Sequence, residues 1–172
     1  ARIRNIALEM FGRYGFERVS MRAVAEAAGC TVGLVQHHFG SKDGLRVAVE
    51  DEIFDYLTTA LAGGPGDVAA RDARVHAMLA FHPEVTDYLR RALLDRPGES
   101  GMLSRIVALS RAEVATMRKS GTIKATRSEQ EQVVHLLVRQ FGVLFLDPMV
   151  AAVWEEMEQP VDSRPELRVT LK

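Results

Sequence analysis

Cysteine, aromatic residues and long apolar runs are all scarce in this sequence, and each scarcity argues against a particular structural feature or class of protein. The single cysteine, Cys30, leaves no partner for a disulfide within the chain, and we expect it to pack as a small buried residue. Aromatic residues make up only 6% of the 172 residues, and the alternation typical of strands is rare. No apolar run reaches the roughly 18 residues of a membrane span, and no signal peptide is visible. We therefore expect an all-helical, cytoplasmic protein without a membrane partner.

Motifs of enzymes and of metal sites are also missing. His76, His82 and His135 are isolated, and none stands in a metal-ligand spacing such as His-x3-His. The adjacent pair His37 and His38 would project about 100° apart on a helix, which does not suit one shared ion. No glycine-rich phosphate loop, nucleophile elbow or Cys-x-x-Cys motif occurs. The sequence thus predicts neither an enzyme nor a cofactor nor a metal site.

Charge is nearly balanced overall but unevenly distributed. The formal net charge is −1, yet residues 1–46 hold seven Lys and Arg against four Asp and Glu, or +3, which leaves −4 for the remainder. A basic N-terminal part on an acidic body favours a nucleic-acid reader with a separate second domain. Chance fluctuation is the alternative reading of the charge pattern alone.

The stretch from Ser20 to Lys42 predicts two short helices joined by a tight turn. The first helix has its apolar residues on one face, namely Met21, Val24, Ala25 and Ala28. Gly29 ends it, Thr31 is a good N-cap for the second helix, and Val35 and Phe39 point back at the first. The free face of the second helix then carries Val32, Gly33, Gln36 and His37. This arrangement favours a helix-turn-helix whose second helix enters the major groove of DNA.

The rest of the chain has helical patterns throughout. We expect a helix over 2–14, one of some twenty residues from Ser41 that is long enough to connect two domains, and further helices over 67–80, from Pro83, and over 103–119. A capping box at 128–131 predicts a helix to Leu146, after which Asp147-Pro148 should begin a last helix that ends near Met157. We place the domain boundary near Val47, giving domains 1–46 and 47–172.

The helix from Ser128 is apolar on more than one face, so it should be buried nearly all round. In a domain this small, one side should meet its own core and the other a second subunit. The predicted dimer interface consists of Val134, Leu137, Val138, Phe141, Leu144, Phe145, Val150, Val153 and Trp154. A helix buried wholly inside one subunit is the alternative.

A specific set of residues runs through the first third of the chain. It comprises Phe-x-x-x-Gly-Phe at the end of the first helix (Phe11 to Phe16), then Ser20, Val24-Ala25, Ala28-Gly29, Gly33, His38-Phe39 and Ser41-Lys42. With these residues, the segment 3–53 resembles the DNA-binding domain of the TetR (tetracycline-repressor-like) transcriptional regulators. The resemblance implies a homodimer that binds a palindromic double-stranded DNA operator, usually represses, and releases DNA when a small-molecule effector binds the C-terminal domain.

Carried over by position, the resemblance implies DNA contacts at Arg22, Thr31, Val32, Gly33, Gln36, His37, His38 and Lys42. The chain departs from the family where Thr is often followed by Leu and Tyr, because it has Leu34, Val35 and Gln36 there. Leu34 lacks the hydrogen bond that Thr would make, whereas the Gln36 amide can pair with N6 and N7 of adenine. We therefore expect Gln36 to be the main base reader and Val32 to contact a thymine methyl.

An effector site is expected in the C-terminal domain. Its candidate residues are Met78, Phe81, His82, Tyr88, Met102, Met117, His135, Gln140 and Phe141, although a residue of this kind taken alone is more often ordinary core. A second class of function also stays open at this point, a helical ligand-binding or scaffold protein whose helix-turn-helix no longer reads DNA.

Overall fold

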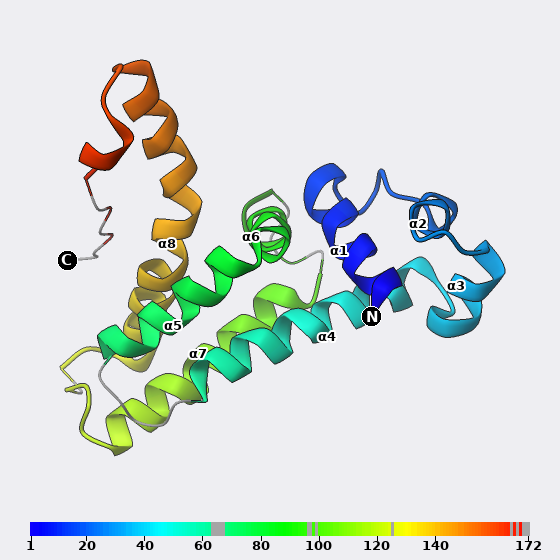
Figure 1. The fold of residues 1–172 in the computed structure, drawn as a ribbon. Helices are drawn as coiled ribbons and strands as arrows, with labels where there is room; N and C mark the ends of the chain where they lie inside the picture. The colour runs from blue at the N-terminus through cyan, green and yellow to red at the C-terminus, as the bar shows by residue number, and fades with distance from the viewer. Residues whose placement is uncertain are drawn as a thin grey trace. The chain divides into compact units, whose positions relative to one another are not determined.

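The computed structural model describes residues 1–62, 68–95, 98, 100–124, 126–165, 167 and 169. Within these ranges every regular element is a helix, which confirms the predicted all-helical class (Figure 1). The chain forms two compact units. Unit 1 comprises residues 1–62 and 77–103, and unit 2 comprises residues 63–76 and 104–172.

Unit 1 is built on the four helices of the N-terminal region. These are α1 (Arg2–Tyr14), α2 (Met21–Ala27), α3 (Val32–Phe39) and α4 (Lys42–Leu61). The last residues of α5 (Val68–Phe81) belong to the same unit, together with α6 (Pro83–Arg90), which continues as the π-helical turn η1 (Arg91–Asp95). The predicted spans of α1 and α4 are confirmed, since α4 is 20 residues long.

Hydroxyl side chains fix where three of these helices begin. The Ser20 hydroxyl accepts a 3.0 Å hydrogen bond from the Ala23 amide, and the Ser41 hydroxyl accepts one of the same length from Gly44. The Thr31 hydroxyl accepts a 3.2 Å bond from the Leu34 amide. Each bond satisfies a backbone donor that the helix itself leaves free. The predicted N-caps at Thr31 and Ser41 are therefore confirmed.

A single apolar core holds α1 to α4 together. Its fully buried members come from each of the four helices and include Ala7, Phe11, Val24, Ala25, Val35, Leu45, Val49 and Ile53. Phe16 folds back on α1, with its ring in edge contact with that of Phe11 at 5.3 Å. The core thus supports α3 from beneath through Val35 and leaves the opposite side of that helix free.

α6 lies directly against the backbone of α1 at Gly12. A Cβ atom on Gly12 would stand 3.1 Å from the Tyr88 nitrogen and 3.2 Å from the Glu84 carbonyl oxygen, so glycine permits a contact that a side chain would prevent. Arg91 then bonds the last turn of α1, through Nε to the Gly12 oxygen (2.6 Å) and through Nη2 to the Arg13 oxygen (2.8 Å). Arg4 of α1 also pairs with Glu52 of α4 at 3.2 Å.

Unit 2 contains the first part of α5, most of α7 (Met102–Lys119), α8 (Glu129–Glu156) and the short 3-10 turn η2 (Val161–Ser163). The capping box at the start of α8 is confirmed, because the Ser128 hydroxyl bonds the Glu131 amide and the Glu131 carboxylate bonds the Ser128 amide. The hydrogen bonds with Ser128 also lower the pKa of Glu131.

The expected helix break at Asp147-Pro148 is wrong, because α8 continues through Pro148 to Glu156. The proline ring fixes φ at a value that a helix accepts, so the cost is confined to the missing N–H and the crowding of the preceding turn.

Ionic and polar pairs join the three helices of unit 2. Arg71 of α5 is 2% exposed and pairs with Glu113 of α7 at 3.1 Å. Asp72 pairs with Arg139 of α8 at 2.5 Å. His76 Nε2 lies 3.1 Å from the main-chain oxygen of Gln140. A buried polar layer therefore accompanies the apolar cluster of Val114, Met117, Val133 and Leu136.

The segment after α8 folds back along that helix (Figure 1). The Trp154 indole donates a 3.0 Å hydrogen bond to the Pro160 oxygen, and Arg164 pairs with Asp147 at 3.0 Å. The Val169 side chain stands 3.2 Å from where a Cβ on Gly142 would lie. Sequence patterns do not predict that this segment folds back on α8, because contacts such as Arg164 with Asp147 join residues several helical turns apart.

Candidate functional site

The exposed side of α3 is the candidate nucleic-acid interface. Val35 is fully buried, whereas Gln36, His37 and His38 are exposed on the same short helix. Of the other residues predicted to contact DNA, Arg22, Thr31 and Gly33 are exposed, and Val32 and Lys42 are half-buried. The fold thus presents hydrogen-bonding side chains on α3 while a buried valine anchors the helix from within.

Gly33 has no internal reason to be glycine. Its backbone is not in the left-handed region, and the nearest heavy atom to a Cβ built there is the Thr31 hydroxyl oxygen at 4.0 Å. A side chain would therefore fit the free protein. The absence of one leaves the α3 backbone open to close approach by a partner.

Leu34 is a candidate contact that the sequence reading missed. The sequence comparison predicts only that Leu34 lacks the hydrogen bond of a threonine. In the structure, however, Leu34 is 42% exposed beside Gly33 on α3. An apolar side chain on such a surface can contact a thymine methyl group. Its position in the sequence indicates this exposure, because helical spacing places Leu34 outside the buried face formed by Val35 and Phe39.

Lys42 has an internal role at the start of α4. Its Nζ donates a 3.3 Å hydrogen bond to the Glu17 oxygen and lies 4.2 Å from the centre of the Phe16 ring. The Arg46 guanidinium lies 4.4 Å from the same ring and pairs with Asp43 at 2.6 Å. Because an ammonium group has three donors, Lys42 keeps donors for a phosphate.

The residues predicted for an effector site divide between the two units. Met78, Phe81, His82, Tyr88 and Met102 lie in unit 1, and Met117, His135, Gln140 and Phe141 lie in unit 2. Phe81 is 83% exposed, so the expectation that it lines a cavity is wrong for this chain. Met102, Met117 and Phe141 are buried as core, and the His82 ring stacks on Tyr56 at 4.3 Å.

Two of these predicted residues stand out as buried polar groups. The Tyr88 hydroxyl donates a 2.6 Å bond to Glu50, and burial followed by this hydrogen bond raises the pKa of Tyr88. Gln140 is 5% exposed, and its side-chain nitrogen has no hydrogen-bond partner within the described part of the chain. A buried amide in that state retains a donor for an acceptor group. A third predicted residue, His135, has its Nδ1 atom 3.2 Å from Nη1 of Arg127.

The predicted dimer residues are only partly on the surface. Phe141 is buried in the single chain, so the expectation that it faces a partner is wrong, whereas Leu137 is half-buried and packs in part on the apolar cluster of unit 2. Val134 and Val153 are exposed as expected, and Trp154 is half-buried. The sequence reading missed three further exposed residues on α8 and at its end, Leu146, Met149 and Met157.

α8 is also long and apolar enough to cross a membrane by length and composition alone, and only 17% of its most apolar window is buried. The exposed residues Leu146, Met149 and Val153 of α8, with Met157 directly after the helix, follow i, i+3, i+7, i+11 spacing, which gives one stripe rather than a uniformly apolar surface. The stripe is unpartnered within the described residues of a single chain. As for metals, no group of three or more His, Cys, Asp or Glu that could hold an ion occurs among those residues.

Comparisons with known proteins agree with this reading of α3. A family model described as bacterial regulatory proteins, tetR family, matches residues 3–49. The HTH-type transcriptional regulatory protein RaaS of Mycobacterium tuberculosis is 32% identical over 171 residues, which cover 98% of this chain and 77% of that protein. The HTH-type transcriptional regulator RutR of Escherichia coli is 24% identical over 170 residues, covering 96% and 74%. The solved structure of SCO4942 from Streptomyces coelicolor aligns with a TM-score of 0.71 at 18% identity, covering 95% of this chain and 89% of the other, a likeness of fold alone.

Proposed function

Since this chain belongs to the tetR family of bacterial transcriptional regulators, we propose that it acts as a homodimeric repressor in the cytoplasm, bound to a palindromic operator and released by a small-molecule effector. The observation that carries the proposal is the exposed polar side of α3, anchored by the buried Val35. Domain 1–46 would read DNA and domain 47–172 would dimerise and bind the effector.

The proposed readout separates base contacts from phosphate contacts. Gln36 would pair with an adenine, and Val32 and Leu34 would pack on thymine methyl groups. Gly33 would allow the backbone between them to come close. The phosphate contacts would come from Arg22, Thr31, His37, His38 and Lys42, which fix the register of the helix in the groove.

Dimerisation would place two copies of α3 in successive major grooves, about 34 Å apart. The surface that supports this is the apolar stripe of α8 formed by Leu146, Met149, Val153 and Met157. Exposed apolar stripes of this kind mark interaction surfaces. The earlier candidates Val134, Val138, Leu144, Phe145, Val150 and Trp154 lie on the same helix and extend the proposed interface.

The proposed effector site rests most firmly on Gln140. Its buried amide lacks a partner within the described chain, and the ion pairs Arg71–Glu113 and Asp72–Arg139 belong to the same unit. An effector with a hydrogen-bond acceptor would satisfy that amide. Met117 and Phe141 would then supply apolar surface nearby in unit 2.

The test is a gel shift with the DNA upstream of the chain's own coding region, repeated over a salt series. A sequence-specific dimer should give a site-dependent shift whose affinity falls steeply as salt rises, because phosphate contacts release counterions. The matched control is the same DNA with the candidate site scrambled. Equal affinity for both DNAs, or no shift at low salt, would favour the alternative of a helical ligand-binding protein that does not read DNA.

A further inference from the structure

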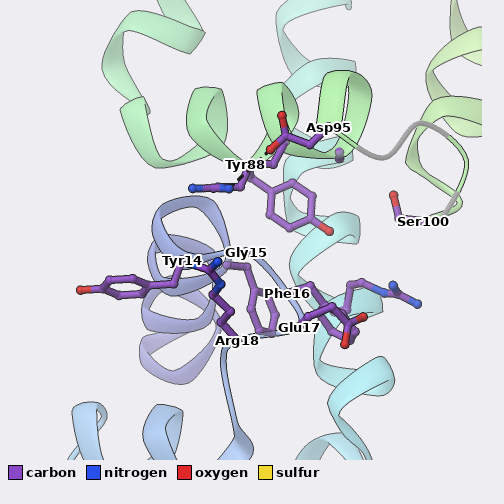
Figure 2. Close-up of a pocket in the computed structure, with 12 residues that line it drawn as sticks. Tyr14, Gly15, Phe16, Glu17, Arg18, Tyr88, Asp95 and Ser100 are labelled. Atoms are coloured by element: carbon purple, nitrogen blue, oxygen red, sulfur yellow. Dashed lines mark hydrogen bonds and ion pairs between the residues drawn. The ribbon is translucent and has the colours of Figure 1, made fainter.

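A cavity of about 290 Å³ lies within unit 1, where the end of α1 and the loop after it meet α4, α6 and η1 (Figure 2). Its wall includes four aromatic residues, Phe11, Tyr14, Phe16 and Tyr88, and three arginines, Arg18, Arg46 and Arg91. The residues predicted to contact DNA are not among those that line it. The cavity is therefore distinct from the α3 surface, and it also lies outside unit 2.

The three arginines differ in how many of their donors are already used. A guanidinium group has five N–H donors. Arg91 bonds the Gly12 and Arg13 oxygens and lies 3.4 Å from Asp95, so it is largely occupied. Arg46 has Asp43 as its ion-pair partner, and Arg18 is exposed, with no side-chain partner within the described residues. Arg18 and Arg46 thus keep donors for an added anion.

Two carboxylates also reach the wall, those of Asp95 and Glu17. Asp95 already pairs with Arg91. Glu17 is exposed on the loop after α1, where water solvates its charge. Two of the three guanidinium groups are thus already paired, Arg46 with Asp43 and Arg91 with Asp95, and the available donors belong to Arg18 and Arg46.

The remaining wall suits a flat apolar group. Tyr88 reaches from α6 toward Phe16, whereas Tyr14 points away from both (Figure 2). Because the Tyr88 hydroxyl is bonded to Glu50, the part of Tyr88 that remains for a ligand is mainly its ring. The volume of 290 Å³ equals that of about ten liquid waters at about 30 Å³ each. A molecule with one ring and one carboxylate fits both this volume and the planar fork of a guanidinium group.

We propose that this cavity binds a small flat organic carboxylate, and that the bound molecule changes the affinity of the protein for DNA. The lining loop Gly15–Arg18 leads into α2, and Arg46 stands in the helix that follows α3. A ligand held by Arg18 and Arg46 therefore fixes the segments on both sides of the helix-turn-helix. The second half of the proposal rests on the proposed DNA-binding function.

The binding half is tested by calorimetry with benzoate as the probe. Benzamide has nearly the same shape without the charge, and it should bind at least about tenfold more weakly because a charge-assisted pair is lost. Arg18→Gln with Arg46→Gln should abolish benzoate binding. The matched control is Arg90→Gln, since Arg90 precedes Arg91 but does not line the cavity, and this variant should bind as the wild type does.

Circular dichroism checks that the double variant is folded, and amide NMR shifts at Gly15, Glu17 and Ala92 locate the bound benzoate independently. Absence of saturable benzoate binding would overturn the site. So would equal affinity for benzoate and benzamide, or benzoate binding retained by a folded double variant.

The regulatory half is tested by repeating the operator titration with and without benzoate. The apparent Kd for DNA should change at least about threefold in the wild type and in Arg90→Gln, and should not change in the double variant. Benzoate binding without any change in DNA affinity would overturn the regulatory half of the proposal, whereas the proposed binding site would stand. A protein that fails to bind any DNA both with and without benzoate would refute the proposed function instead, while the calorimetry still decides the site.

Discussion

The Tyr88 hydroxyl donates a 2.6 Å hydrogen bond to Glu50, and both side chains are at most 5% exposed. The bond joins α6 to α4 inside unit 1. A carboxylate removed from water needs a donor, and the phenol supplies one. The pair therefore holds α6 on the helix that follows α3, close to the Gly12 contact with α1.

Tyr88→Phe should lower the free energy of unfolding by about 2 kcal/mol, because Glu50 stays buried without its donor. The measurement is urea unfolding followed by circular dichroism. Tyr14→Phe is the matched control, since Tyr14 is 48% exposed and its loss should cost less than about 0.5 kcal/mol. Equal effects of the two substitutions would contradict a special role for the buried pair.

The same tyrosine predicts a pH dependence at the alkaline side. Burial, followed by the hydrogen bond to Glu50, raises the pKa of Tyr88 above the ordinary value of 10.0. Above about pH 10 the unfolded chain loses the phenolic proton while the folded chain keeps it, so stability falls as pH rises. The fall should be steeper in the wild type than in Tyr88→Phe. Parallel pH profiles for the two proteins would show that Tyr88 does not titrate in this way.

Gly33→Ala separates folding from DNA recognition. Nothing in the chain would collide with the new methyl group, and alanine favours a helix over glycine by up to about 1 kcal/mol. The variant should unfold at a higher urea concentration yet bind the operator about tenfold or more weakly. Undiminished operator affinity would mean that DNA does not approach this part of α3.

Gln36→Ala should lose about 1–3 kcal/mol of discrimination at one adenine of the operator. The readout is competition binding against operators changed one base pair at a time. His38→Ala is the comparison, because loss of a phosphate contact should weaken all operators alike. An unchanged base preference in Gln36→Ala, with affinity lowered evenly, would refute its role as the main base reader.

Met149→Arg with Val153→Arg should convert the dimer to a folded monomer, because two charges would be buried in an apolar interface. Both side chains are more than half exposed in the single chain, at 57% and 51%, so the fold itself should tolerate the change. Sedimentation velocity measures the assembly. Glu155→Arg alters charge on the same helix outside the apolar stripe and should remain dimeric, and a dimeric double variant would exclude this surface.

Local signals in the sequence predicted much of this fold. Spacing of apolar residues placed α1, and the hydroxyl residues Thr31, Ser41 and Ser128 marked helix starts that the structure confirms. The polar side of α3 was likewise visible, because Val35 and Phe39 alone define its buried stripe. These features depend on residues within one or two helical turns of each other.

Features that depend on distant residues could not be predicted in the same way. The Tyr88–Glu50 bond joins positions 38 apart, and Arg91 bonds α1 across 79. Pro148 predicted a helix end because proline locally disfavours a helix, but α8 continues through it. Similarly, the aromatic side chain of Phe81 predicts a cavity residue, although only three-dimensional packing shows that it is exposed.

The contact at Gly12 has a mechanical consequence. Where side chains separate two helices, a small displacement is absorbed as rotamers change, but here main chain rests on main chain. Arg91 adds two bonds to carbonyl oxygens at the same crossing. We therefore expect α6 and α1 to move together as one rigid body. A displacement of α6 should then also displace the first helix of the N-terminal region.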